Sequence, residues 1–196
     1  MTPGAARAAV FLDRDGCLNE DWLNPATGAW ESPLSPGDLI LRPGVVDGLL
    51  RLQGAGLPLV LVSNQPSFAK GKCSLADLAA VHARLLALLG PEGVRFLECC
   101  YCHHHPDAVM PGYGGACPCR KPAPGFLLRS AERYALALAG SWMIGDRDTD
   151  IACGKRAGTR TIQIANPRAG HQAGQATPDH RAPDFAAAVA IICGGV

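Results

Sequence analysis

The sequence has no long hydrophobic run and no surplus of charge of either sign. The leucine-rich stretch at residues 75–89 is interrupted by Asp77, His82 and Arg84, which makes it too polar for a membrane-spanning helix. Residues 1–9 lack the basic region and apolar run of a signal peptide. The 18 Lys and Arg residues offset 17 Asp and Glu residues to a formal net charge of +1, which disfavours binding to a nucleic-acid backbone or a membrane surface. We expect a cytoplasmic protein with neither kind of partner.

Aromatic residues are also scarce, at 6%, whereas hydrophobic residues make up 48% of the chain, so an aliphatic core is predicted and general disorder is excluded. The nine cysteines are an odd number, which disfavours a disulfide framework and favours a reducing compartment. The 23 Gly and 16 Pro residues predict several long or sharply turned loops. A length of 196 residues is typical of one domain, and we expect a monomer.

Short aliphatic runs alternate along the chain with segments of helical periodicity. The predicted strands are residues 8–12, 58–62, 95–101, 141–144 and 160–164, and the predicted helices are residues 45–53, 74–89, 125–139, 148–157 and 185–192. Such alternation is typical of the α/β class. We therefore expect a single Rossmann-like domain over residues 1–196, with a mainly parallel sheet flanked by helices.

Three segments fit neither the strand nor the helix period. They are residues 19–42, 102–122 and 165–183, and all are longer than ordinary connections, which predicts that at least some are functional loops. The first and third have no large apolar core of their own. We therefore expect no separate cap domain over the body of the protein.

Carboxylates follow two of the predicted strands directly. Asp13 and Asp15 come after the first strand, with Gly16 permitting a tight turn, and Asp146 comes after the fourth. Open parallel sheets bind ligands outside the carboxyl ends of their strands. One carboxylate there can attack an electrophile while another exchanges a proton with the leaving group, and a hard cation can bridge them. The alternative is that these residues are ordinary turn formers and helix caps.

The loop at residues 102–119 carries a set of metal-ligand residues. Cys102 and His104 are two residues apart, as are Cys117 and Cys119, so each pair can point to one side of an extended turn. Together they predict a closed structural zinc site with three cysteines and one histidine. Arg120 and Lys121 follow the last ligand, so zinc would hold two cations beside the carboxylates. The alternative is three buried free thiols and surface histidines.

Four separated motifs, in this order, resemble those of the haloacid dehalogenase-like phosphatases. They are FLDRDG (residues 11–16), VSNQ (62–65), RKP (120–122) and MIGDRDTD (143–150). The resemblance implies that Asp13 is a nucleophile that forms an aspartyl-phosphate, and that Asp15 protonates the leaving alcohol and then activates water. It also implies that Ser63 and Lys121 hold the phosphoryl oxygens, and that Mg²⁺ binds the Asp13 carboxylate, the Asp15 backbone carbonyl and Asp146.

The cysteine loop, together with the four motifs, resembles the capless, histidinol-phosphatase-like branch of this family. Within that branch, the sequence is similar to enzymes that remove a phosphate from heptose bisphosphates in bacterial heptose biosynthesis. The implied partner is a small phosphorylated sugar. Asp21, Asn64 and Gln65 are expected to contact its hydroxyl groups, and Arg120 to bind the phosphate that is not cleaved. Alternatively, Arg120 caps the sheet edge or pairs with Asp150.

Two further questions stay open at the level of the sequence. Asp150 either steadies Lys121 or is a carboxylate of the first helical turn. The activity is either that of a heptose bisphosphate phosphatase or that of a phosphatase for histidinol phosphate or another small sugar phosphate. A zinc-stabilised interaction module without catalysis is the alternative from a different class.

Overall fold

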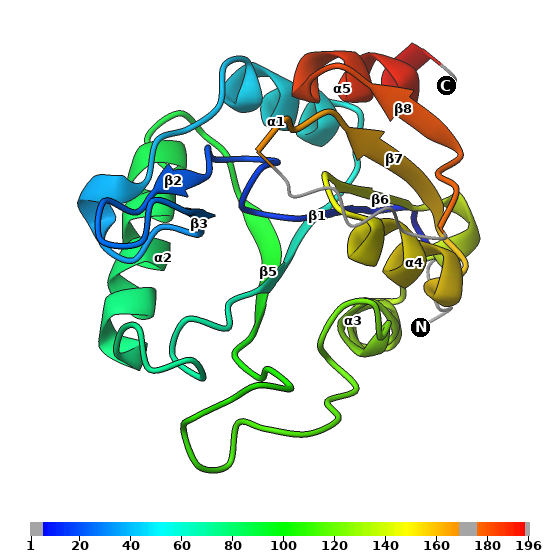
Figure 1. Ribbon diagram of the computed structural model, residues 1–196. Coiled ribbons are helices and arrows are strands. Elements are labelled where there is room, and N and C mark those ends of the chain that lie inside the picture. Colours follow the sequence, from blue (N-terminus) through cyan, green and yellow to red (C-terminus); the bar gives the residue numbers. More distant parts are fainter. Residues whose placement is uncertain (1–5, 169–175, 195–196) are drawn as a thin grey trace.

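Six strands form one parallel sheet with helices on both faces in the computed structural model of the chain (Figure 1). The structure describes residues 6–168 and 176–194. The strand order is β5-β4-β1-β6-β7-β8, and each neighbouring pair is parallel. The prediction of an α/β fold with a mainly parallel sheet is therefore confirmed.

The strands and helices lie close to their predicted positions. The strands of the sheet are β1 (Val10–Leu12), β4 (Leu59–Asn64), β5 (Phe96–Cys102), β6 (Trp142–Gly145), β7 (Arg160–Ile164) and β8 (His180–Ala182). The helices are α1 (Val45–Gly54), α2 (Leu75–Leu89), α3 (Gly125–Tyr134), α4 (Asp148–Ala157) and α5 (Phe185–Gly194). In the described residues, no helix has both the length and the apolar character needed to cross a membrane.

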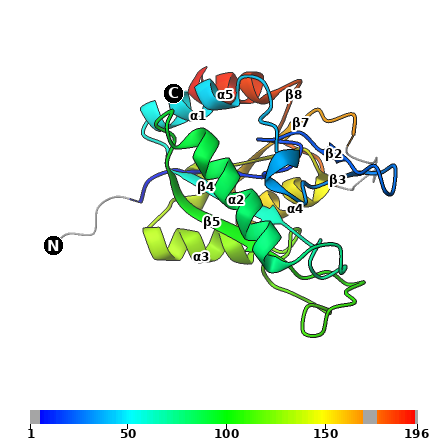
Figure 2. The ribbon, with the colours of Figure 1, turned by 90° about the vertical axis from the view of Figure 1, so that its left-hand side faces the viewer.

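Two apolar clusters, one on each face of the sheet, bury nearly every residue of the central strands β1, β4 and β6. Successive strand residues alternate between them: Val10 and Leu12 belong to the cluster under α1, α2 and α5, and Phe11 belongs to the cluster under α3 and α4. Figure 2 shows α1 and α5 above the strands and α3 below them. Burial on both faces explains why the predicted strands are continuous aliphatic runs rather than alternating ones.

The structure corrects three predicted boundaries. Helix α3 ends at Tyr134 rather than 139, because Ala135 adopts a left-handed conformation and the next residues turn to pair with Arg7. Segment 165–183 is not wholly irregular, since it contains edge strand β8, whose exposed His180 and Arg181 hide it from a hydrophobicity pattern. Segment 19–42 contains the hairpin β2 (Trp22–Leu23) and β3 (Trp30–Glu31) and the 3₁₀ helix η1 (Pro36–Asp38).

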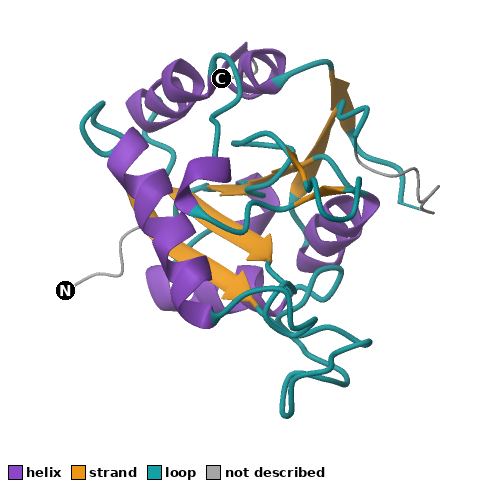
Figure 3. Ribbon diagram, turned by 60° about the vertical axis from the view of Figure 1, so that its left-hand side comes forward, coloured by secondary structure: helices purple, strands orange, loops and turns teal. Residues whose placement is uncertain are grey.

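The topology creates a crevice at the carboxyl ends of β1 and its neighbours. The chain moves from β1 to β4 and β5 on one side, and returns to β6, β7 and β8 on the other. Ligands bind at such a switch point in open parallel sheets. In Figure 3 the loop that follows β5 extends beyond the arrowhead ends of the strands. The residues after β1, β4 and β6 are therefore brought together at one edge of the sheet.

Candidate active site

Lys121 links two buried carboxylates, that of Asp13 directly after β1 and that of Asp150 in the first turn of α4. Its Nζ lies 2.7 Å from Oδ1 of Asp13 and 2.6 Å from Oδ1 of Asp150. The same nitrogen donates a hydrogen bond of 2.8 Å to the carbonyl oxygen of Val62. An ammonium group has three protons, so all three are directed to acceptors. The ammonium group is therefore held at a fixed point beside Asp13.

Asp150 does both of the things that the sequence left open. Its Oδ1 faces Lys121, and its Oδ2 accepts a hydrogen bond of 3.0 Å from the backbone N–H of Arg147 at the start of α4. Gly145 makes room for this carboxylate, because a Cβ atom there would lie 2.4 Å from its Cγ and Oδ2. The residue thus caps its helix and positions the lysine at the same time.

The site around Lys121 contains more negative than positive charge, because three carboxylates surround one ammonium group. Ligand oxygens of Asp13, Asp146 and Asp150 lie within 4.8 Å of one another, and all three residues are buried. Burial raises the pKa of Asp13 to about 6, with Asp150 and Asp15 adding to the shift and Lys121 opposing it. Burial and the charges of Asp13 and Asp150 raise the pKa of Asp146 to about 8. The like charges of these carboxylates disfavour full ionisation of all three, and a bound metal cation would offset the repulsion.

The donor set fits a hard divalent cation. Oδ1 of Asp146 is buried and has no hydrogen-bond partner in the part of the chain that the structure describes. An unpaired buried carboxylate oxygen is costly. Oxygen ligands of this kind are those that Mg²⁺ takes in proteins, so the geometry suits a magnesium ion held between Asp146 and Asp13.

Asp15 is held on both oxygens by a set of buried donors. Arg14 donates through Nε to Oδ1 (2.9 Å) and through Nη2 to Oδ2 (3.2 Å), while Asn19 adds a bond to Oδ1 (3.0 Å) and Gln65 one to Oδ2 (2.6 Å). Burial by itself raises the pKa of Asp15, but the charge of Arg14 and these hydrogen bonds outweigh it and hold the pKa below its usual value. Sequence reasoning did not single out Arg14.

The three residues after β4 have different surroundings. Ser63 lines the cleft, and its Oγ accepts a hydrogen bond of 3.0 Å from Nε2 of Gln65. Asn64 also lines the cleft, but its side chain makes two reciprocal bonds of 3.0 Å with the backbone of Lys121. Gln65 is buried behind the cleft between Arg14 and Asp15. The side-chain amides of Asn64 and Gln65 were expected to contact a sugar. They instead hold other residues of the site, Asn64 the backbone of Lys121 and Gln65 the side chains of Asp15 and Ser63.

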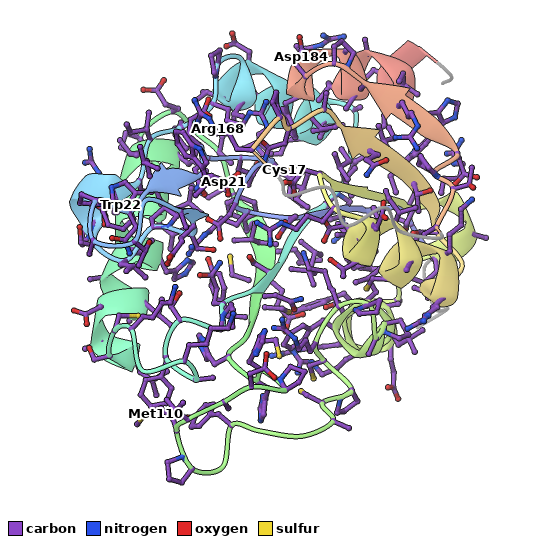
Figure 4. All side chains as sticks on the ribbon, viewed as in Figure 1. Cys17, Asp21, Trp22, Met110, Arg168 and Asp184 are labelled. Carbon is purple, nitrogen blue, oxygen red and sulfur yellow. The ribbon has the colours of Figure 1, made fainter. Side chains whose placement is uncertain are left out.

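Asp21 lies behind the cleft wall rather than on it. Its Oδ2 accepts a hydrogen bond of 2.7 Å from Nδ2 of Asn166, which also donates to Oδ2 of Asp146 (2.8 Å). Asp21 and Cys17, both labelled in Figure 4, are buried. Asn166 was missed by sequence reasoning, although it lies two residues beyond the end of β7, where the strand-end rule that found Asp146 also applies.

The carboxylates open onto a cleft of about 1060 Å³. Its wall carries several basic side chains, and three of them lie together on the side of the cysteine loop: Lys70, His105 and Arg120. Burial lowers the pKa of His105, and the charges of Lys70 and Arg120 lower it further. Arg120 donates to the carbonyl oxygen of His104 at 2.8 Å, and no ion pair joins it to Asp150 in the described residues. The cleft therefore offers a cationic patch, defined here as Lys70 and Arg120, with His105 beside them as an uncharged hydrogen-bonding group.

The cysteine loop brings three of the four predicted metal ligands together. Ligand atoms of Cys102, His104 and Cys117 lie within 4.8 Å of one another, with 3.8 Å between the two sulfur atoms. Cys119 lies outside this group. Burial raises the pKa of the Cys119 thiol, and the nearby Cys117 raises it further. His103 points instead to the backbone oxygen of Gln65. Figure 4 shows Met110 on the part of this loop that projects from the body.

Comparison with known proteins points to one family. A family model described as HAD-hydrolase-like matches residues 118–188. The D-glycero-beta-D-manno-heptose-1,7-bisphosphate 7-phosphatase of Mesorhizobium japonicum is 36% identical over 166 residues, which are 85% of this chain and 73% of that protein. The protein of the same name from Pseudomonas putida is 35% identical, over 79% of this chain and 81% of its own.

A solved structure extends the likeness to nearly the whole chain. The crystal structure of D,D-heptose 1,7-bisphosphate phosphatase from B. bronchiseptica, complexed with magnesium and phosphate, has a TM-score of 0.80 and 30% sequence identity. The match covers 96% of this chain and 99% of that one. Fold and sequence therefore agree on the same relatives.

Proposed function

The chain belongs to the HAD-like hydrolases, among the heptose bisphosphate 7-phosphatases, and we propose from this that it hydrolyses the C7 phosphate of D-glycero-D-manno-heptose 1,7-bisphosphate with Mg²⁺ as cofactor. One observation carries the proposal. The Asp13 carboxylate lies 2.7 Å from a fully buried lysine at the switch point of the sheet, beside the unpaired oxygen of Asp146. That arrangement suits a nucleophile that must approach a negatively charged phosphate.

The reaction has two steps on the residues of this chain. In the first, Oδ1 or Oδ2 of Asp13 forms a bond to phosphorus as the bond between phosphorus and the C7 oxygen breaks. Asp15, whose lowered pKa keeps it charged in the protein without substrate, takes up a proton when the phosphate binds and gives it to the C7 oxygen. In the second, Asp15 takes a proton from water, and the water oxygen bonds to phosphorus as the bond between phosphorus and Asp13 breaks, which releases inorganic phosphate and restores the Asp13 carboxylate. Lys121 and Ser63 stabilise the charge on the equatorial oxygens. Mg²⁺, held by Asp13, the Asp15 carbonyl and Asp146, would neutralise further charge there.

The cationic patch is our candidate site for the phosphate that is not cleaved. Arg120 has the guanidinium fork that binds phosphate oxygens in pairs, and Lys70 lies close enough to His105 to lower the pKa of that imidazole. The patch shares one cleft with Asp13 and Lys121. A sugar with a phosphate at each end can therefore span from the patch to the nucleophile. Because the relatives at 35–36% identity are named for the beta anomer, we propose the same preference.

Zinc is the second metal that we propose. Cys102, His104 and Cys117 already cluster, and Cys119, two residues beyond Cys117, is the fourth candidate ligand. A closed four-ligand site is structural. It would fix the loop that carries Arg120 and Lys121, and so hold both cations at the cleft.

The test is phosphate release measured side by side on the two anomers of the heptose bisphosphate and on histidinol phosphate. The proposal predicts the highest kcat/KM for the beta anomer and dependence on added Mg²⁺. A clear preference for histidinol phosphate would overturn the substrate assignment. Absence of phosphatase activity on every substrate would favour a non-catalytic module.

A further inference from the structure

Asn166 connects a buried carboxylate to the carboxylate at the metal position. Its Nδ2 donates one hydrogen bond of 2.8 Å to Oδ2 of Asp146 and another of 2.7 Å to Oδ2 of Asp21. Both aspartates are buried, with 4% of their surface exposed. An amide nitrogen has two protons, so both are used on these two carboxylates. The three side chains form a unit that we call the Asn166 clamp.

The clamp determines which oxygen of Asp146 is free. Since Oδ2 is bound to Asn166, the other oxygen, Oδ1, is left buried and unpaired, in the group that contains Asp13 and Asp150. Rotation of the carboxylate would break the bond to Asn166. One oxygen is thus fixed by the amide, and the other is presented to the position between the aspartates.

The backbone of the first motif leaves space for the clamp. Gly16 has a φ of +76°, and a Cβ atom on it would lie 2.4 Å from both Nδ2 of Asn166 and Oδ2 of Asp146. No real Cβ contact is that short. The turn after Asp15 is therefore closed tightly against the clamp, and any side chain at this position would push the amide off the carboxylate.

We propose that Asn166 is a positioning residue for magnesium, which sets the orientation of the Asp146 carboxylate through its amide and through the anchor supplied by Asp21. This inference rests on the Mg²⁺ site of the proposed function. It also gives Asp21 a part in metal binding rather than contact with the sugar. Partners that orient a metal ligand typically change metal affinity by about 10–100-fold when they are removed.

Asn166 also makes a local hydrogen bond, and an experiment on the clamp must not disturb it. Its Oδ1 accepts a hydrogen bond of 3.1 Å from the backbone N–H of Arg168, which shapes the loop after β7. Serine can make the same local turn with its hydroxyl group, but it is too short to reach Asp146. Asn166→Ser therefore keeps the turn and removes the clamp.

Asn24 offers a matched control. Its Oδ1 accepts a hydrogen bond of 2.9 Å from the backbone N–H of Ala26, the same two-residue turn, and none of its hydrogen bonds in the described residues reaches Asp146. Asn24→Ser therefore makes the same chemical change in a loop without the clamp. Asp21→Ala is the second variant, because it loosens the clamp while leaving Asn166 and its turn in place.

The experiment titrates Mg²⁺ alone into each protein by isothermal calorimetry, using protein prepared without chelator so that any zinc stays bound. Asn166→Ser is expected to raise the Kd for Mg²⁺ by about tenfold, Asp21→Ala to raise it less, and Asn24→Ser to leave it unchanged. The kcat of Asn166→Ser at saturating Mg²⁺ should stay close to that of the wild type. Thermal unfolding of each variant establishes that it is folded.

Two results overturn the inference while the proposed function stands. One is an unchanged Mg²⁺ affinity in both folded clamp variants. The other is a loss of kcat in Asn166→Ser that saturating Mg²⁺ does not restore. If the wild-type protein itself binds no Mg²⁺, the proposed metal site fails and the inference fails with it.

Discussion

Arg14 and Asp15, neighbours in the chain, form a buried two-pronged ion pair at the centre of the site, with Nε 2.9 Å from Oδ1 and Nη2 3.2 Å from Oδ2. Nη2 of Arg14 also donates to Oε1 of Gln65 at 2.9 Å, which turns the Gln65 amide so that its nitrogen faces Asp15 and Ser63. The arginine therefore fixes the carboxylate directly and through the glutamine. A carboxylate held in this way has one orientation until substrate arrives.

Arg14→Lys keeps the positive charge and removes the guanidinium fork, so Asp15 loses its fixed orientation. We expect turnover of an alkyl phosphate, whose leaving oxygen needs a proton, to fall by about 10²-fold, the range of one general acid. The rapid release of nitrophenol from p-nitrophenyl phosphate should fall much less, because that leaving group needs no proton. Rapid-mixing kinetics on the two substrates measures both values.

The matched control is Arg133→Lys, at an exposed arginine whose ion pair with Glu98 lies on the surface. It should leave both activities unchanged. An equal loss on the two substrates in Arg14→Lys would show that Arg14 supports the fold and not the proton transfer.

Lys121→Met removes the only cation that contacts Asp13 and Asp150 in the described residues. The charge that develops on the phosphoryl oxygens then loses a fixed donor, and we expect kcat/KM to fall by about 10³-fold. Steady-state phosphate release at saturating Mg²⁺ measures the effect. Lys155→Met, which breaks a surface pair with Asp179, is the control and should change kcat/KM little. A decrease in Lys121→Met no larger than that in the control would remove Lys121 from the mechanism.

The raised pKa values of Asp13 and Asp146 predict how stability depends on pH without Mg²⁺. Burial and neighbouring carboxylates raise these values from an ordinary 3.8 to about 6 and about 8. Through these two groups the folded protein binds more protons than the unfolded chain between about pH 4 and pH 8, so they make the free energy of unfolding fall as the pH rises through that window. Burial lowers the pKa of His82, His103 and His105 from 6.5, and these groups act in the opposite direction around and below that pH. Asp15, whose pKa is lowered, acts in the opposite direction only at lower pH.

Urea unfolding at a series of pH values in Mg²⁺-free buffer measures this dependence. Asp146→Asn should remove most of the slope between pH 6 and pH 8, and excess Mg²⁺ should reduce it in the wild type, because the ion stabilises the charged carboxylates. A wild-type slope of opposite sign between about pH 7 and pH 8, where Asp146 titrates and the histidines do not, would contradict the charge arrangement described for the site.

The zinc proposal predicts a structural role. Purified protein should contain about one zinc per chain, as a closed four-ligand site would. A zinc-selective chelator should lower both the unfolding temperature and the activity at excess Mg²⁺, and added zinc should restore them. Cys117→Ser should reproduce the loss, whereas Cys193→Ser, at a cysteine far from the loop in sequence, should not. A folded, active sample without zinc would remove the site.

Much of the fold could be predicted because its central strands are buried on both faces. Runs such as Val10–Leu12 are apolar throughout, and Ser74 and Asp77 form the capping box that marks the start of α2. β8 could not be found, since two of its three residues are exposed and polar. The end of α3 depends on pairing with Arg7, a contact between distant segments that no local pattern records.

The residues of the candidate site could also be predicted only in part. Asp13, Asp146 and Lys121 stand in motifs, and the structure brings them together as the motifs imply. Arg14 and Asn166 act through other side chains, so neither residue type signals its part from the sequence alone. Asn64 and Gln65 were expected at the sugar because amides suit hydroxyl groups, but their amides are taken up by Lys121 and by Asp15.

The central claim is that Asp13 becomes phosphorylated during turnover. The most direct measurement mixes the protein with heptose bisphosphate and Mg²⁺, quenches in acid within one turnover, and identifies the modified peptide by mass spectrometry. The account predicts a phosphoryl group on Asp13 in the wild type, and neither adduct nor phosphate release in a folded Asp13→Asn variant. Phosphate release at the wild-type rate by Asp13→Asn, or a phosphoryl group on a different residue, would contradict it.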